Sequence, residues 1–331
     1  MGSKESNTIL GIDIGYSNLK LAFGKKGETP KTILRPAGAA PVDRFGFRFD
    51  GKEHSDLLHV MVDDDEFIAG VSSDRAEMWT RSLHADYPSS PSYKALFHAG
   101  LLLSEFDHID TLVTGLPVNQ FLDEERKKKL TEQMLGTHQV TKKRSITVNN
   151  VKVIPQPVGG LLDHIASVGA EEIEDARILV VDPGFFSVDW VVIANHDLNR
   201  KSSGTSHHAS SIVLEEAAKL LAKDYGANIS IEVLENAVRN KKDNVMVLGQ
   251  RIEYMPYIDL AMKTVGSVVV ETIQKSLRTD NSGVDMIVLV GGGSIFFKDA
   301  LSSVFNKTKI ITPSESVFAN ARGFWYMGAA V

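Results

Sequence analysis

Two stretches of the chain share one pattern of apolar and polar positions. Residues 9–24 read ILGIDIGYSNLKLAFG, and residues 178–193 read ILVVDPGFFSVDWVVI. In both, an apolar strand ends in Asp-x-Gly and a second apolar strand follows, which predicts a β-hairpin with an acidic turn. A pattern that occurs twice in one chain predicts two similar domains. We expect the two turns to face each other across a cleft.

The rest of the chain alternates between strand and helix periodicity, which predicts an α/β fold with central mixed sheets. Short apolar segments among Pro, Gly and Asp predict a small β-rich insertion at about 25–95, and a second insertion spans about 200–254. Further strands are predicted at 110–114, 145–154 and 284–290. Helices are predicted at 93–106, 121–135, 157–168, 209–224, 229–240 and 255–277, with a last helix from about residue 317.

Composition limits the classes of protein to consider. The length of 331 residues is enough for two domains. The chain has no cysteine, which excludes disulfides and thiolate metal sites and fits a reducing compartment. No apolar run approaches the roughly 18–20 residues of a membrane span, and no signal-peptide pattern opens the chain. A net charge of −6 gives no general attraction to nucleic acid. We therefore expect a cytoplasmic protein with neither a membrane nor nucleic acid as a direct partner.

The two acidic turns contain residue types that suit a triphosphate with its metal ion. A glycine follows each aspartate two positions later, Gly15 after Asp13 and Gly184 after Asp182. Glycine permits a tight turn whose backbone N–H groups can approach phosphate oxygens. A carboxylate contacts phosphate favourably only through a cation, and hydrated Mg²⁺ uses few protein ligands. A single Asp-x-Gly hairpin is also an ordinary β-turn, so the duplication is what favours a nucleotide site.

The two hairpins differ at one charged position. Lys20 lies on the second strand of the first hairpin, where an ammonium group can neutralise phosphate charge. Asp189 stands at the matching position of the second hairpin, where we expect it to hold water or structure instead.

Two further segments are candidates for the same site. Gly291, Gly292 and Gly293 follow an apolar strand and open a helix, which describes either a simple turn or a bare backbone against which a ring or sugar can lie. The chain has no G-x-G-x-x-G spacing there and no Walker A motif. Gln156 lies between two prolines. Its amide could orient a water molecule for attack on a γ-phosphate, although a glutamine in this setting is usually a loop residue.

With these residues in view, the chain resembles the actin-like ATPase superfamily, which also contains sugar kinases and the seventy-kilodalton heat-shock chaperones. GIDIGYSNLK and VDPGFFSVDW resemble its two phosphate loops, GLPVNQF with IPQPVGGLL its first connecting segment, LVGGGSIFF its adenosine motif, and VFANARGFWYMG its second connecting helix. The resemblance implies an actin-like fold, a duplicated ribonuclease-H-like architecture with nucleotide in the interdomain cleft. Domain I would comprise 8–156 with the helix 317–331, and domain II 157–316.

Within the superfamily, the chain is most similar to plasmid-segregation actins of the ParM/StbA type and related prokaryotic actin-like proteins. The Asp-x-Gly-Tyr-x-Asn-x-Lys form of the first loop and the Ala-Asn-Ala-Arg-Gly helix carry this similarity. It implies that Asp13 and Asp182 hold a hydrated Mg²⁺, that Lys20 touches phosphate and that Gln156 places the attacking water. The implied nucleotide-binding residues are Gly15, Tyr16, Ser17, Asn18 and Lys20 in the first loop, Gly184, Phe185, Phe186 and Ser187 in the second, and Gly291, Gly292 and Gly293.

The resemblance implies an ATPase, with GTP as a possible substitute for ATP, that assembles into dynamic filaments for plasmid or DNA segregation. Its partners would be further copies of itself, head to tail, and a DNA-binding adaptor protein. The second loop departs from the family pattern, because Phe185 and Phe186 stand where small residues are usual. Two rings at this point keep open the alternative of a nucleotide-binding regulator that does not polymerise. A small-molecule kinase of the same superfamily is a separate alternative, which would need a catalytic aspartate near its substrate.

Overall fold

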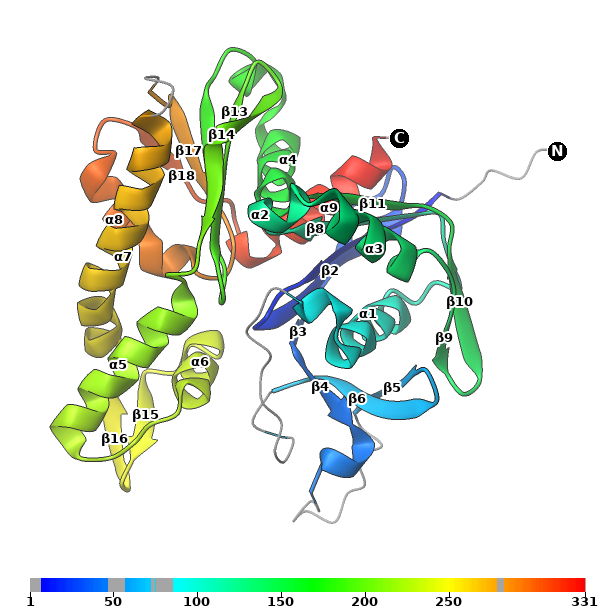
Figure 1. Ribbon diagram of the computed structural model, residues 1–331, viewed down its shortest axis with the longest axis horizontal. Coiled ribbons are helices and arrows are strands. Elements are labelled where there is room, and N and C mark those ends of the chain that lie inside the picture. The colour runs from blue at the N-terminus through cyan, green and yellow to red at the C-terminus, as the bar shows by residue number, and fades with distance from the viewer. Residues whose placement is uncertain (1–6, 47–56, 73–74, 76–85, 279–282, 331) are drawn as a thin grey trace. The chain divides into compact units, whose positions relative to one another are not determined.

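The computed structural model describes residues 7–46, 57–72, 75, 86–278 and 283–330 (Figure 1). The chain forms two compact units: unit 1 comprises Met1–Glu172 with Pro313–Val331, and unit 2 comprises Ile173–Thr312. The first unit extends past the expected boundary at residue 156, because helix α4 (Gln156–Val168) packs along helix α9 (Ala319–Ala329). The assignment of functional domains stays a prediction. Among the described helices, none has the length and apolar character needed to cross a bilayer.

Both units are built on a five-stranded sheet with the same strand order. In unit 1 the order is β11-β8-β1-β2-β3, and in unit 2 it is β18-β17-β12-β13-β14. The strands of unit 1 are β1 (Thr8–Ile14), β2 (Asn18–Lys25), β3 (Lys31–Pro36), β8 (Thr111–Leu116) and β11 (Val151–Pro155). Those of unit 2 are β12 (Ile178–Pro183), β13 (Val188–Ala194), β14 (Asp197–Ser206), β17 (Met286–Leu289) and β18 (Lys309–Ile311).

The strand register is also repeated. In the antiparallel hairpins, Asp13 lies opposite Lys20, and Asp182 lies opposite Asp189. In the parallel pairs, Ile12 lies opposite Thr114, and Val181 lies opposite Leu289. In both units, the residue before the aspartate therefore pairs with a residue of the neighbouring parallel strand. This repeated pairing confirms the internal duplication expected from the two matching stretches.

Both insertions begin later than the sequence pattern indicates, because β3 and β14 belong to the central sheets. The first insertion then contains η1 (Val42–Arg44) and the sheet β4-β6-β5, formed by Gly38–Pro41, Asp65–Val71 and Leu58–Val62. The predicted strand 145–154 is in fact two strands, β10 (Arg144–Val148) and β11, in different sheets. Strand β10 pairs with β7 (His108–Ile109) and β9 (Gly136–Thr141).

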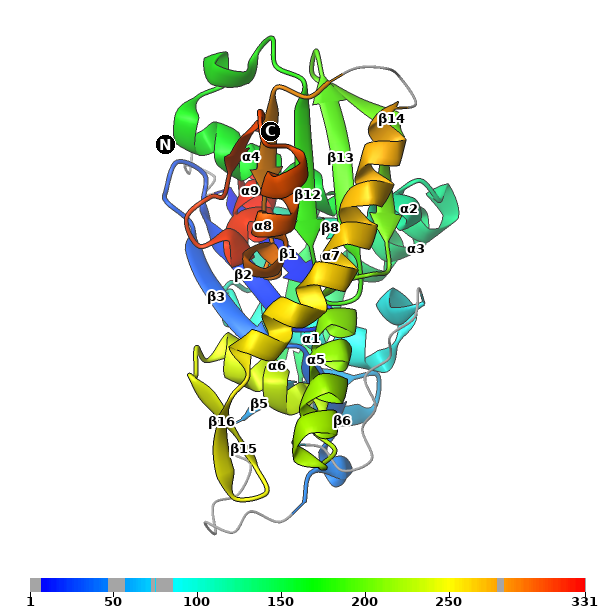
Figure 2. The same cartoon turned by 90° about the vertical axis from the view of Figure 1, so that its left-hand side faces the viewer.

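The predicted helices are confirmed within a few residues at their ends. Besides α4 and α9, the described residues form helices α1 (Pro91–Leu103), α2 (Val118–Phe121), α3 (Glu124–Met134), α5 (Ser210–Tyr225), α6 (Ile231–Arg239), α7 (Met255–Arg278) and α8 (Ser294–Val304). Local signals explain two of the helix ends: Ser90 caps the start of α1 by accepting from Tyr93 N, and Gly226 ends α5 with a φ of 68°. Figure 2 shows α7 running beside α5 and α8, with the hairpin β15–β16 (Asn244–Val247, Gln250–Glu253) below α6.

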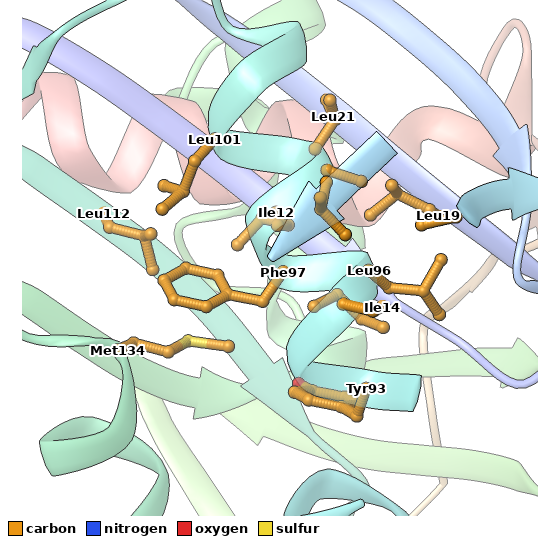
Figure 3. Packing of buried hydrophobic residues seen from close by; sticks show 14 of the residues in the cluster. Ile12, Ile14, Leu19, Leu21, Tyr93, Leu96, Phe97, Leu101, Leu112 and Met134 are labelled. Carbon is orange, nitrogen blue, oxygen red and sulfur yellow. The ribbon is translucent and has the colours of Figure 1, made fainter. Parts of the chain in front are cut away.

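Strand β1 presents its side chains alternately to two layers of helices. Leu10, Ile12 and Ile14 belong to the core that α1 covers. Figure 3 shows Phe97 of the same core together with Ile12 and Ile14. Ile9 packs in a separate cluster with residues of α9. Asp13, two pleats beyond Ile9, therefore points to the α9 side of the sheet, which is also the side on which α4 lies.

Helices α4 and α9 cross at a point where no side chain fits. A Cβ atom on Gly323 would lie 1.7 Å from the carbonyl oxygen of Gly159. Beside this crossing, Arg322 donates two hydrogen bonds of 2.7 Å to the buried carboxylate of Asp163 and a third, also 2.7 Å, to the carbonyl of Ser314. The two parallel hydrogen bonds from the guanidinium offset the cost of burying the carboxylate. The crossing fixes α4 and thereby the position of its first residue, Gln156.

We expect the stability of unit 1 to fall in mild acid. Burial lowers the pKa of His98 to about 4 from 6.5, with smaller contributions from His138 and Lys94. Because the folded-state pKa is below the unfolded value, the stabilisation is complete above pH 6.5 and is lost as pH falls towards 4, by at most about 3 kcal/mol. Urea unfolding between pH 7 and pH 4.5 should show a weaker pH dependence for His98→Gln, whereas the exposed-site control His208→Gln should keep it. If the free energy of unfolding depended on pH equally in the wild type and both variants, His98 would not be the source of the loss of stability.

Candidate functional site

The carboxylate of Asp13 is the centre of the site in unit 1. Asp13 is only 2% exposed and lies next to the last residue of β1. Its Oδ2 accepts from Lys20 Nζ at 2.8 Å, and its Oδ1 accepts from Gln156 Nε2 at 3.3 Å. Burying a carboxylate is costly unless it is paired and hydrogen-bonded, and these two groups fulfil both conditions. The structure thus brings together three of the residues singled out from the sequence.

Lys20 reaches Asp13 because the hairpin register places the two residues opposite each other. Its ammonium group also lies beside the turn, since a Cβ atom on Gly15 would be 3.4 Å from Lys20 Nζ. The turn is closed by a hydrogen bond of 3.0 Å from Gly15 N to Asn18 O. The positive charge of Lys20 is therefore held at the end of the hairpin, close to the backbone of Gly15.

Gln156 is the first residue of α4 and is placed by a neighbouring glycine. A Cβ atom on Gly115 would lie 2.8 Å from Gln156 Cγ and 2.5 Å from Phe324 Cζ. Gly115 comes at the end of β8, so the sheet edge, the start of α4 and α9 converge there. The Gly-Leu-Pro segment thus makes room for the glutamine, which the sequence alone does not indicate.

The other predicted residues of the first loop have defined roles in the turn. The ring of Tyr16 stacks on Tyr87, with ring centroids 4.6 Å apart and planes at 28°. Asn18 Nδ2 donates to Ser17 Oγ at 3.0 Å, and Ser17 O accepts from Ala37 N at 2.9 Å. The side chain of Tyr16 is used for packing, which leaves the backbone of the turn as the part that can meet a ligand.

The second hairpin has the same turn but a different electrostatic arrangement. Gly184 N donates to Ser187 O at 2.8 Å, as Gly15 N does to Asn18 O. Asp189 is buried and accepts hydrogen bonds of 2.6 Å from the hydroxyls of Ser187 and Thr205. These two hydroxyls, one from the turn and one from β14, hold the carboxylate within the hairpin, so Asp189 has one of the two roles expected for the counterpart of Lys20, that of holding structure.

The triple glycine lies against Asp182, which is 7% exposed. Gly291 has a φ of 79°, and a Cβ atom there would be 2.0 Å from Asp182 Oδ1. Only glycine combines this backbone conformation with this approach to the carboxylate. Gly293 N donates to Pro183 O at 2.9 Å, and Gly292 between them is exposed. The structure therefore joins the second acidic turn and the triple glycine into one constellation.

The two phenylalanines of the second loop both pack against protein. Phe185 is buried, and the ring of Phe186 lies 5.1 Å from that of His207. The loop also binds the start of α5, because Ser211 N donates to Phe185 O at 2.9 Å and Ser210 N donates to Gly184 O at 3.3 Å. The backbone of the loop is thus tied directly to the first helix of the second insertion.

Sequence reasoning did not identify Ser210. Its hydroxyl is buried, makes no hydrogen bond within the described residues, and would lie 2.5 Å from a Cβ atom on Gly293. A serine at the start of a helix is an ordinary capping residue in a sequence, so no local signal could have distinguished it. Among the residues that the structure describes, no group of three or more His, Asp or Glu side chains forms a metal cluster.

Comparisons with known proteins extend over both units. Residues 11–159 match a family model for the N-terminal domain of actin-like proteins, and residues 180–303 match one for the C-terminal domain of MreB-like archaeal actin homologues. An archaeal actin homolog from Thermoplasma acidophilum is 21% identical over 329 residues, which cover 96% of this chain and 97% of the relative.

Solved structures share the fold. An archaeal actin homolog in complex with ADP superposes with a TM-score of 0.76 at 19% identity, covering 98% of this chain and all of that chain. A ParM subunit from a 15-stranded filament of Clostridium botulinum gives a TM-score of 0.74 at 17% identity, with 98% and 100% coverage. These likenesses confirm the expected actin-like fold. The duplicated sheets, the two family matches and these structures lead to one conclusion: the chain belongs to the actin-like ATPase superfamily.

Proposed function

We propose that this protein is an ATPase that binds Mg-ATP through its two acidic hairpins and assembles head to tail into filaments. The observation that carries the proposal is the repeated turn, in which a buried carboxylate lies beside glycine backbone: Asp13 with Gly15, and Asp182 with Gly291. Solved relatives support adenine nucleotide as the ligand, because one is an archaeal actin homolog with ADP and another is a ParM with AMPPNP. GTP is the second nucleotide to test.

The residues present fit a hydrated magnesium ion. Asp13 and Asp182 supply hard oxygen donors, and both are buried. The described residues contain no larger cluster of acidic or histidine side chains, which agrees with an ion that keeps most of its water ligands. When bound, magnesium would neutralise charge on the phosphate oxygens. The assignment of both aspartates to this ion is a proposal, as is the assignment of Gly291, Gly292 and Gly293 to the adenosine.

Three groups of unit 1 would act on the γ-phosphate. Lys20 would stabilise charge on the phosphoryl oxygens, since its ammonium lies beside the turn. The amide nitrogen of Gln156 donates to Asp13, which orients the amide group and leaves its oxygen to accept from a water molecule. The Gly15 amide closes the turn, and the turn amides that follow it, up to Asn18, would bind phosphate oxygens. Catalysis of this kind depends on positioning rather than on covalent chemistry.

The second loop provides a route from nucleotide state to assembly. Its carbonyls at Gly184 and Phe185 accept from the first amides of α5. A change in the loop on loss of the γ-phosphate would therefore be passed to α5 and to the small subdomain that contains α6 and the hairpin β15–β16. A displacement of this kind, ordered by one phosphate group, is a common way for a nucleotide to control an interface.

The tip of the hairpin β15–β16 supports self-association. Leu248 at the tip is 75% exposed and Met246 is 58% exposed, while Val245 and Val247 on the other face are buried. Leu248 also has a φ of 46° and is followed by Gly249 at 80°, a turn that favours Asn-Gly. A leucine here loses roughly 1–2 kcal/mol to backbone strain and leaves apolar surface in water. A second copy of the chain that covers this tip would offset both costs.

Filaments would be the natural product of such a contact. A head-to-tail interface that does not close a ring generates an open polymer. One relative is a 15-stranded ParM filament, and another is a non-polymerisable ParM mutant. The net charge of −6 favours an indirect link to DNA through a basic adaptor protein, in a cytoplasmic segregation system.

Asp182→Asn should nearly abolish ATP hydrolysis while the protein remains folded. The substitution keeps the shape of the side chain and removes the charge that would hold magnesium, so we expect turnover to fall about 100-fold or more. Phosphate release measured alongside thermal unfolding separates activity from stability. Asp175→Asn, at an exposed position of the same unit, is the matched control. Turnover within a factor of two of the wild type would defeat the assignment of Asp182.

Gln156→Ala should slow hydrolysis more than it weakens ATP binding. The glutamine is proposed to act on water rather than on ATP, so kcat should fall about tenfold or more while the Kd changes little. Single-turnover hydrolysis and equilibrium titration measure the two quantities separately. Gln139→Ala, exposed on β9, controls for loss of an amide side chain. Parallel losses in kcat and affinity would assign Gln156 to substrate binding instead.

Leu248→Asn should raise the critical concentration for assembly about tenfold, which corresponds to about 1.4 kcal/mol per contact. Asparagine suits the left-handed backbone conformation, so the free energy of unfolding should stay the same or increase. Pelleting with ATP, with ADP and without nucleotide measures assembly, and Leu260→Asn on the exposed face of α7 serves as control. Assembly of Leu248→Asn at the wild-type critical concentration would exclude the tip as a contact.

A further inference from the structure

Three tyrosine rings form a continuous stack that starts in the first acidic turn. Tyr16 lies in the turn itself and stacks on Tyr87 at 4.6 Å. Tyr87 belongs to the short helix η4 (Tyr87–Ser89) and meets Tyr93 of α1 edge to face, with ring centroids 5.3 Å apart and planes at 90°. Tyr87 and Tyr93 are both buried. Aromatic pairs in these two geometries are favourable beyond the apolar area that they bury.

The inner end of the stack is attached to the other side of the same turn. The hydroxyl of Tyr93 hydrogen-bonds with that of Thr114, and Thr114 Oγ1 donates to Ile12 O at 2.8 Å. Ile12 directly precedes Asp13. Burial raises the pKa of Tyr93, and the neighbouring Tyr87 and Asp13 raise it to a smaller extent.

One pair of buried tyrosines thus supports the backbone before Asp13 and the backbone after Gly15. Ordinary core packing would require only apolar rings at these positions, as at Phe97 in the same core. A buried phenol is unfavourable unless its hydroxyl is hydrogen-bonded, and the bond that Tyr93 makes leads through Thr114 to the strand end that carries Asp13. The arrangement therefore restrains the turn as well as filling space.

We propose that Tyr87 and Tyr93 are positioning residues that hold the first turn in its phosphate-binding conformation before nucleotide arrives. The inference rests on the proposed function of the turn. Neither residue would touch the nucleotide. A turn that is already ordered loses less conformational entropy when phosphate binds, and it holds the Asp13 carboxylate and the turn amides where hydrolysis requires them.

The test compares Tyr87→Leu with Tyr87→Phe. Leucine removes the ring stack and phenylalanine keeps it. In nucleotide-free protein, Tyr87→Leu should speed amide hydrogen exchange at Gly15–Asn18 about tenfold, and it should lower kcat for ATP about tenfold with a smaller change in Kd. Tyr87→Phe keeps the ring contacts and should change both quantities much less than Tyr87→Leu does. Phe106→Leu, which loses an edge-to-face contact with Phe23 in the same core, is the control for lost packing.

A second variant covers the case in which Tyr87→Leu does not fold. Tyr93→Phe keeps the packing and removes only the hydroxyl, so it should speed exchange at Ile14 and Gly15 several-fold and lower kcat by a similar factor. The proposal is overturned if both variants match the wild type in exchange and kcat, or if Phe106→Leu produces the same changes. A wild-type protein that does not bind ATP would instead refute the proposed function, while faster exchange in Tyr87→Leu would still show that the stack restrains the turn.

Discussion

The structure depends on the cost of burying a carboxylate at the end of a central strand in each unit. Asp13 is stabilised by Lys20 and Gln156, which come from the next strand and from the start of α4. Three features make these contacts possible: the hairpin register that sets Lys20 opposite Asp13, the space that Gly115 leaves for Gln156, and the crossing of α4 with α9 at Gly323. In unit 2, the bare backbone of Gly291 admits the carboxylate of Asp182. An isolated buried charge would cost several kcal/mol, so the fold requires each of these features to keep the two carboxylates buried.

The duplicated scaffold carries two different electrostatic solutions. The same position of the hairpin holds Lys20 in unit 1, where its ammonium pairs with Asp13, and Asp189 in unit 2, where the carboxylate accepts hydrogen bonds from two hydroxyl groups. The first turn is restrained by a stack of tyrosines, whereas the second is bound through its carbonyls to α5. This difference agrees with the proposed division of roles, in which the first turn would position phosphate and the second would transmit its presence to the small subdomain.

Much of the fold could be predicted from the sequence, because the duplicated hairpin, the long amphipathic helices and the glycine positions are local patterns. The polar outer strands β3 and β14 were assigned to insertions, since edge strands of this kind lack a clear apolar alternation. The membership of α4 in unit 1 depends on packing against α9, which lies about half the length of the chain further on. Asp13, Lys20 and Gln156 could be singled out as residue types, but their mutual contacts, the tyrosine stack and the buried hydroxyl of Ser210 arise only from tertiary packing.

A double-mutant cycle on nucleotide affinity tests the central claim most directly. Titration calorimetry of Mg-ATP with the wild type, Asp13→Asn, Asp182→Asn and the double variant would show whether the two carboxylates serve one ion. If they do, removal of either carboxylate disrupts the same interaction. The double variant should then bind Mg-ATP only slightly less tightly than whichever single variant binds it less tightly, with a coupling free energy of about 1–3 kcal/mol. Losses that simply add would show that the two acidic turns act independently and would contradict the account.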